Sequence, residues 1–180
     1  MGKRALTGIM MGLCMLAAAQ ADPLDRNEIG RGANWLVHAD LDAFRGSTLG
    51  SLVMAELKAQ GVEQKLQDFV TIFSVDPLRD ISGVTLYGTG QDRNNAVVVV
   101  DGKFDPEKLL AVVRWNPQYQ EIPYQGATIH QWPNEEKKGS QTTTRMMYGT
   151  ILDGRKIVLS TGLDTVKQTV DALKSPGAGA

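Results

Sequence analysis

Residues 84–101, VTLYGTGQDRNNAVVVVD, hold the pattern that decides the fold. Two segments rich in β-forming side chains, 84–90 and 95–101, flank the polar residues 91–94, and this arrangement predicts a β-hairpin. Residues 96–100 are apolar at every position, whereas a strand with one face in water alternates apolar and polar side chains. We therefore expect both faces of the second strand to be covered.

The chain before this hairpin predicts one strand and two helices. Residues 33–41 alternate between apolar and polar side chains, which is typical of a half-buried strand. Apolar residues then recur at helical spacing in 49–57 and in 66–73. Gly61 and the pair Asp76-Pro77 are the expected stops of these two helices.

The chain after the hairpin predicts another helix and two short strands. Asp105-Pro106-Glu107 combines an N-cap, a proline in the first turn and an acid near the positive end of the helix dipole. Residues 118–132 predict two short strands around Gln125-Gly126. We interpret the charged residues 133–143 as a mobile hydrophilic loop.

The last part of the chain predicts a second tight hairpin and a closing helix. Segments 145–152 and 155–160 flank Asp153-Gly154, a dipeptide that a type I′ turn prefers. Thr161-Gly162-Leu163-Asp164 resembles a capping box at the start of the helix.

These elements predict an α+β fold, with an antiparallel sheet and helices mainly on one face. The opening order β-α-α-β-β-α-β is ferredoxin-like, and it would place the strand at 96–100 beside the first strand. Residues 86–113 and 147–173 also share the order strand, turn, strand, helix, and both contain Tyr-Gly-Thr. We interpret this as a faint internal repeat.

Four stretches carry a further pattern: residues 35–42 (WLVHADLD), 97–100 (VVVV), 124–130 (YQGATIH) and 152–160 (LDGRKIVLS). Together they resemble uncharacterised exported bacterial proteins built on a domain of unknown function. The resemblance implies export and a ferredoxin-like α+β fold, in proteins that often contain a second similar half. Its motifs mark turns and strand ends, so it assigns no catalytic residue.

The N-terminus predicts a cleaved signal peptide. Lys3 and Arg4 precede an apolar run at 5–19, and Ala19 and Ala21 supply the small residues that signal peptidase needs. The run is shorter than the roughly 20 residues of a membrane-spanning helix. We expect cleavage after Ala21, export to the periplasm or beyond, and no transmembrane anchor after processing. The remaining divisions would be a flexible leader at 22–32, one domain at 33–174 and a flexible tail at 175–180.

Composition excludes several classes of protein. The 180 residues are 42% hydrophobic and 22% charged with a net charge of −1, and the aromatic residues follow no basic stripe, so we expect no nucleic-acid partner. The single cysteine, Cys14, lies in the predicted signal peptide. The mature chain would therefore have no disulfide and no thiol nucleophile. We expect no cofactor.

His38, Asp40 and Asp42 are the candidate site residues. They recur at every second position, so a strand would place one imidazole and two carboxylates on one face. Histidine and aspartate are common ligands of zinc and of harder cations. The alternative is that His38 and Asp40 are solvated and Asp42 caps the following helix. His130, the other histidine, has no nucleophile beside it and predicts a structural role.

Three functions remain open from the sequence. The leading prediction is an exported non-enzymatic module that binds an envelope or extracellular component, or a second copy of itself through an apolar sheet face. The second is a metal-binding protein or metal-dependent hydrolase centred on His38, Asp40 and Asp42. The third is a small-ligand sensor domain with a pocket between helices and sheet.

Overall fold

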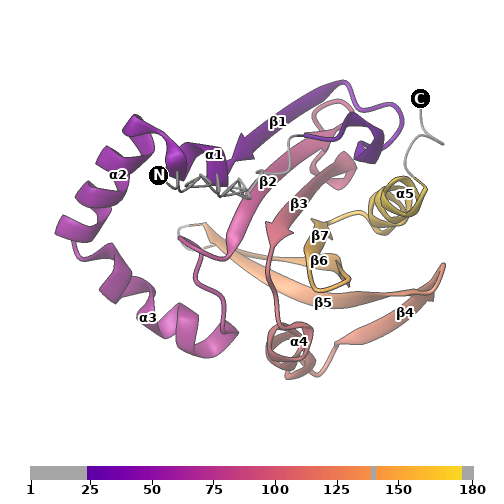
Figure 1. Cartoon of the computed structure of the whole chain (residues 1–180). Helices are drawn as coiled ribbons and strands as arrows, with labels where there is room; N and C mark the ends of the chain where they lie inside the picture. The colour runs from indigo at the N-terminus through magenta and orange to yellow at the C-terminus, as the bar shows by residue number, and fades with distance from the viewer. Residues whose placement is uncertain (1–23, 139–140, 176–180) are drawn as a thin grey trace, which may run out of the picture.

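The computed structural model describes residues 24–138 and 141–175, which form an α+β fold around an antiparallel sheet, as the sequence predicts. The sheet has seven strands in the order β1-β2-β3-β7-β6-β5-β4 (Figure 1). The strands are β1 (Trp35–Asp40), β2 (Ile81–Gly88), β3 (Ala96–Gly102), β4 (Gln120–Tyr124), β5 (Ala127–Lys138), β6 (Gln141–Leu152) and β7 (Lys156–Ser160). The predicted signal peptide with its cleavage site, and the tail beyond Ser175, lie outside the described residues.

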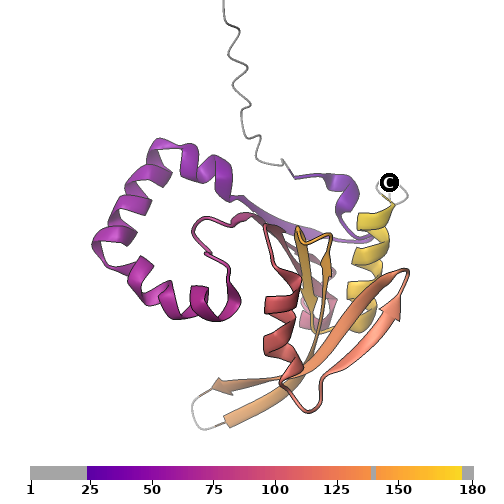
Figure 2. The ribbon, with the colours of Figure 1, turned by 60° about the horizontal axis from the view of Figure 1, so that its bottom comes forward.

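The helices lie on both sides of this sheet. They are η1 (Arg26–Glu28), α1 (Leu41–Gly46), α2 (Thr48–Ala59), α3 (Val62–Phe73), η2 (Arg93–Asn95), α4 (Pro106–Arg114) and α5 (Leu163–Lys174). α5 covers one face, whereas α1 to α4 lie on the other side, so most helices share one side as predicted (Figure 2). The three consecutive helices α1, α2 and α3 curve away from the sheet, and we call them the arc.

The core lies between α5 and the sheet. Val97 and Val99 of β3, Val158 of β7, and Val166 and Val170 of α5 are all almost completely buried there. Because side chains alternate along a strand, Val98 and Val100 face the opposite side, where they are half-buried. We expected both faces of β3 to be covered. The face towards α5 is fully covered, and the opposite face is only partly covered.

Local turn and cap predictions agree with the structure at several positions. Gln125 and Gly126 join β4 to β5, Asp153 and Gly154 join β6 to β7, and all four residues have positive φ, as type I′ turns require. The Asp105 carboxylate accepts a hydrogen bond from the Lys108 N–H at 3.3 Å and caps α4. The capping box predicted at the start of α5 is wrong, because Gly162 is the N-cap and has no side chain to accept a hydrogen bond.

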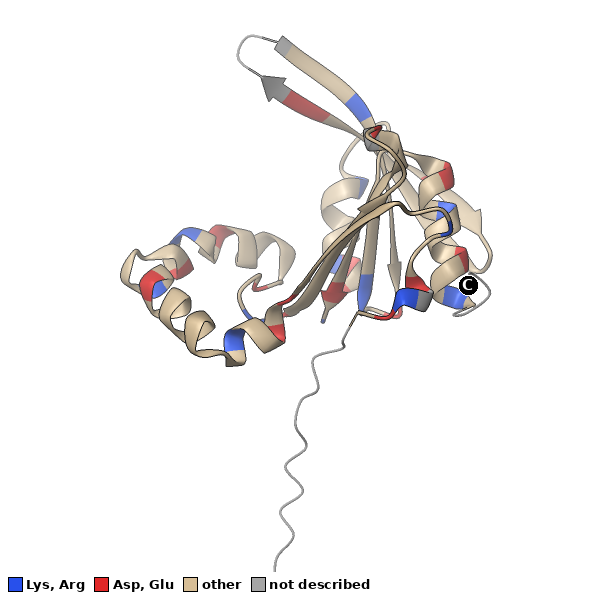
Figure 3. Cartoon of the chain, turned by 90° about the horizontal axis from the view of Figure 1, so that it is seen from above, with Lys and Arg blue, Asp and Glu red and all other residues tan. Residues whose placement is uncertain are grey.

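The predicted loop at 133–143 is also wrong. β5 and β6 continue as a long antiparallel hairpin up to the pair Lys138 and Gln141. Glu135 and Glu136 lie opposite Thr144 and Thr143, so charged side chains face β-branched ones across the ladder. The charges indicated a loop, but the ladder of backbone hydrogen bonds and the β propensity of threonine support a strand here. Figure 3 shows this hairpin projecting from the body of the molecule.

The predicted neighbours of the first strand are wrong as well. β1 pairs with β2, with Trp35 opposite Gly88, and β3 lies between β2 and β7. A ferredoxin-like opening needs the first helices to cross the sheet and return beyond the neighbouring strand. Here the arc returns the chain directly alongside β1 in the antiparallel direction.

The two units of the faint repeat share the order of their elements, but they do not occupy equivalent positions in the fold. The units β2-β3-α4 and β6-β7-α5 both exist, but α4 and α5 lie on opposite sides of the sheet. Tyr87 pairs with Val97 next to the turn of its hairpin, whereas Tyr148 pairs with Ser160 well before its turn.

Candidate functional site

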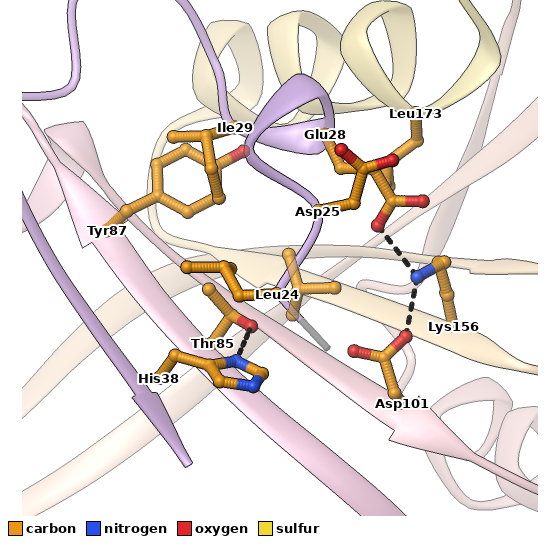
Figure 4. Close-up of a pocket in the computed structure, with 11 residues that line it drawn as sticks. Leu24, Asp25, Glu28, Ile29, His38, Thr85, Tyr87, Asp101, Lys156 and Leu173 are labelled. Carbon is orange, nitrogen blue, oxygen red and sulfur yellow. Dashed lines mark hydrogen bonds and ion pairs between the residues drawn. The ribbon is translucent and has the colours of Figure 1, made fainter. Parts of the chain in front are cut away.

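The leader predicted to be flexible packs against the domain in its described part and closes a small cavity. η1 contacts α5, and Ile29 packs on the hydrophobic core. The cavity of about 150 Å³ lies between this segment, the end of α5 and the sheet (Figure 4). It is lined by Leu24, Asp25, Glu28, Ile29, His38, Thr85, Tyr87, Val99, Asp101, Lys156 and Leu173.

Lys156 is the central charge of this cavity. Its Nζ lies 2.8 Å from Glu28 Oε2 and 2.7 Å from Asp101 Oδ1, so it joins η1 to β3. Partial burial lowers the pKa of Lys156, but the hydrogen bonds to Asp101 and Glu28 outweigh this effect and raise the pKa above its usual 10.5. The ammonium group therefore stays charged and acts as an internal counterion for the acids around it.

His38 contributes one satisfied and one unsatisfied nitrogen. Nδ1 lies 2.9 Å from Thr85 Oγ1, whereas Nε2 is buried and has no hydrogen-bond partner among the described residues. An unsatisfied buried polar atom costs about 1 to 3 kcal/mol. His38 is thus the polar side chain of the cavity with unused hydrogen-bonding capacity.

Tyr87 and Thr169 form the polar contact at the other end of the cavity. The Tyr87 hydroxyl lies 2.9 Å from Thr169 Oγ1 on α5, and both residues are buried. Burial raises the pKa of Tyr87, and the hydrogen bond to Thr169 opposes that rise only in part. The hydroxyl is therefore neutral at physiological pH, and it ties β2 to α5.

The three sequence-predicted site residues do not converge on one point. β1 ends at Asp40, so Asp42 lies in α1 and not on the strand face with His38. Asp40, and not Asp42, caps α1, because its Oδ1 accepts a hydrogen bond from the Ala43 N–H at 2.8 Å. Asp42 forms an ion pair with Arg45. Residues 24–138 and 141–175 contain no group of three or more side chains placed to share a metal ion.

His130 has the structural surroundings that the sequence predicts. It is buried, and its Nδ1 lies 2.6 Å from the Tyr119 hydroxyl, which donates a hydrogen bond to Glu121 at 2.6 Å. Burial lowers the pKa of His130, and the nearby Glu121 carboxylate opposes this only in part. The hydrogen bond from Tyr119 lowers the pKa of Glu121. The sequence analysis did not identify Tyr119 or Glu121 as partners.

Lys156 and its two partners were also not identified from the sequence, although one signal existed. Lys156, Val158 and Ser160 share one face of β7, and Val158 and Ser160 are buried. A lysine in line with buried positions indicates a partnered charge. Its partners Glu28 and Asp101 are 128 and 55 residues away, so no local pattern could reveal them.

A second feature is an apolar surface on the side of the sheet opposite to α5. Val37 of β1 lies opposite Leu86 of β2, and these side chains are 59% and 37% exposed. Among the described side chains, α3 buries none, and α2 buries only Gly50. We use the name arc surface for the exposed apolar residues Trp35, Val37, Leu49, Leu52, Val53, Phe69, Ile72 and Leu86, whose exposed fractions run from 36% to 65%.

No helix within residues 24–138 and 141–175 combines the length and the apolar character that crossing a membrane demands. Comparison with known protein families, with curated proteins and with solved structures finds no match to this chain. The resemblance to exported bacterial proteins therefore stays a prediction, and the function must be argued from the cavity and the arc surface themselves.

Proposed function

We propose that this protein is an exported, non-enzymatic module whose arc surface binds a protein partner outside the cytoplasm. The observation that carries the proposal is the exposure of apolar side chains on α2 and α3. Each has 12 residues, and each exposes apolar side chains that include Leu49, Leu52 and Ile72, at 64%, 65% and 56%. Helices of this length are marginal in water unless an apolar face packs against something else. The arc therefore needs a partner for its stability.

The composition of the arc surface also favours a protein partner. Exposed apolar side chains that gather on one side of a soluble protein often mark a site of protein–protein interaction. Phe69, which is 39% exposed, packs against Phe73 in a tilted arrangement with ring centroids 4.5 Å apart, so aromatic area is available at the end of α3. Aromatic anchors of this kind carry much of the binding energy in protein interfaces. Export of the module is supported by the charged and apolar pattern of residues 1–21.

The cavity supports a small-ligand function less well. Its volume of about 150 Å³ is below the range of roughly 300 to 1,000 Å³ that is typical of ligand pockets. A larger hollow of about 590 Å³ lies at the end of α5, beside Arg31, Gln125 and Asp171. Lys156, the cation at its centre, already bonds to Glu28 and Asp101. We interpret the contacts around the cavity as those that hold the N-terminal segment against the domain.

The proposal is tested by placing charge on the arc surface. In Leu49→Glu and Leu52→Glu, we expect the folded chain to lose binding of a hydrophobic dye, while the free energy of unfolding changes by less than about 0.5 kcal/mol, as for ordinary surface positions. Val112→Glu on α4 is the matched control, because Val112 is 37% exposed and lies outside the arc surface. In native gels of the extracytoplasmic fraction, the arc variants should lose a complex that the control retains.

Two results would contradict the proposal. One is a folded chain that binds no dye. The other is a loss of about 2 kcal/mol or more of unfolding free energy in Leu52→Glu, since a loss of that size is typical of a core position.

A further inference from the structure

The two edges of the sheet differ in how they are protected against further strand pairing. The edge strand β4 contains Pro123, which has no N–H to donate, and the exposed charge of Glu121. Proline and charge are the features with which proteins block sheet edges. The other edge strand, β1, reads Trp-Leu-Val-His-Ala-Asp; it has no proline, and its acid, Asp40, lies at the last position and caps α1. Its residues Trp35, Leu36 and Val37 are 38%, 39% and 59% exposed.

An unprotected edge of this kind is a template for one more strand. β1 is also continuous with the arc, because α1 begins at Leu41, immediately after the strand ends at Asp40. We therefore expect a single partner to pair with the open edge of β1 and to cover the neighbouring apolar surface. We propose that this partner is a second copy of the chain, which pairs its β1 antiparallel to the first and joins the two sheets; this inference rests on the proposed function.

Self-complementarity favours a second copy. A twofold axis perpendicular to the sheet and just outside the free edge of β1 makes the interface isologous, so the same residues meet from both sides. The operation keeps the faces of the sheet, and it places both arcs on the side that carries Val37 and Leu86. Each α5 stays on the opposite side.

Charge selects the antiparallel direction. The exposed Arg31 precedes β1, and the acidic Asp40 lies at its end; Asp42 follows, but it is paired with Arg45 of its own helix. In antiparallel pairing the acidic end of one strand lies at the basic end of the other, whereas parallel pairing would place the acidic ends side by side. Val37, which is 59% exposed, lies near the middle of the strand, and we place it opposite Val37 of the second copy.

The test measures oligomeric state by sedimentation equilibrium. We expect the purified chain to form a dimer without any other protein. Val37→Lys should raise the dimer dissociation constant at least about 30-fold, as the loss of a central hot spot does. Gln120→Lys is the matched control, because it places the same charge at an exposed position of the other edge strand, β4, and it should leave the dissociation constant unchanged. Thermal melts establish that both variants fold.

A cysteine cross-link tests the register. In the Cys14→Ser background the chain has no other cysteine, and directly opposite residues of an antiparallel pair have Cα atoms about 4.5 to 5.5 Å apart, within disulfide reach. With oxidised glutathione as oxidant, Val37→Cys should form a covalent dimer, whereas Gln120→Cys should form the dimer without a covalent link between its chains.

The proposal is overturned by a monodisperse monomer at 100-fold the concentration used for the dye measurement. A dimer that tolerates Val37→Lys also overturns it, because another surface would then form the contact. The proposed function fails separately: it loses support if the arc variants bind dye as the unmodified chain does, whatever the oligomeric state.

Discussion

Lys156 shows how one side chain connects distant parts of this protein. Its ammonium group bridges Glu28 of η1 and Asp101 of β3, and only a quarter of the lysine side chain is exposed. When one member of a partly buried charged cluster is removed, the remaining charges are left without a partner at short range. The N-terminal segment is held by this contact and by the packing of Ile29 on the core.

We expect Lys156→Met to release this segment. The two carboxylates would repel each other, so the free energy of unfolding should fall by about 1 to 2 kcal/mol, a value reduced from that of a fully buried pair because water reaches the site. Trypsin should cleave faster after Arg26 and Arg31 than in the unmodified chain. Lys103→Met, at an exposed lysine, is the control. If the additional change Glu28→Gln restores none of the lost stability, the charge argument is wrong.

At the scale of elements, the junction of β1 and α1 joins the sheet to the arc. Asp40 ends the strand and caps the helix. Arg45 then fastens α1 to the segment that leads into β2, by donating hydrogen bonds to the Leu78 carbonyl at 3.3 Å and the Ile81 carbonyl at 2.8 Å. These contacts give the arc a fixed starting point, and at its other end α3 contacts α4.

Asp40→Ala should destabilise the chain by about 1 kcal/mol, the usual cost of losing an N-cap. This is more than the half kilocalorie or less that a solvated side chain would cost. Asp40→Ser should recover most of the loss, because a hydroxyl also caps a helix. Chemical denaturation measures both variants. A melting temperature that rises with added zinc or calcium, and ceases to do so in Asp40→Ala, would instead favour the metal site.

At the scale of the whole molecule, one face of the sheet is buried and the other face is only partly covered. α5 seals the first, with Val166 and Val170 fully buried. On the second side, α4 and the network of Tyr119, Glu121 and His130 lie at one end, and the arc surface lies at the other. We therefore expect changes at His130 to affect the free energy of unfolding, and changes on the arc surface to affect association with a partner.

The stability of the whole chain should fall in mild acid because of His130. Burial lowers the pKa of His130 below 6.5 in the folded state, so the unfolded chain binds the proton more readily. The contribution of His130 is present above pH 6.5 and is lost as pH falls towards the lowered folded pKa. Urea midpoints at pH 7.5 and pH 5 should differ less in His130→Gln than in the unmodified chain. Equal differences would show that His130 is not the group responsible.

The sequence by itself determined the parts of this protein that depend on short-range geometry. The turn at Asp153-Gly154 and the cap at Asp105 follow from the φ values and hydrogen bonds available to adjacent residues. Alternation in 33–41, and the β-forming side chains of 84–90 and 95–101, predicted strands.

Only the tertiary structure decided which of these elements meet. The placement of β3 beside β7, the extension of β5 and β6 through charged residues, and the bonding of Lys156 to Glu28 all depend on pairing between segments far apart in the chain. The β propensity of each segment is compatible with many alternative strand pairings. The difference in free energy between these pairings comes from the burial and the ladder hydrogen bonds that form as distant segments come together. The same reason explains α2 and α3: their spacing predicted helices, but only the tertiary structure showed which apolar side chains stay exposed and which are half-buried. Leu49, Leu52 and Ile72 are exposed, whereas Leu66 and Val70 are half-buried.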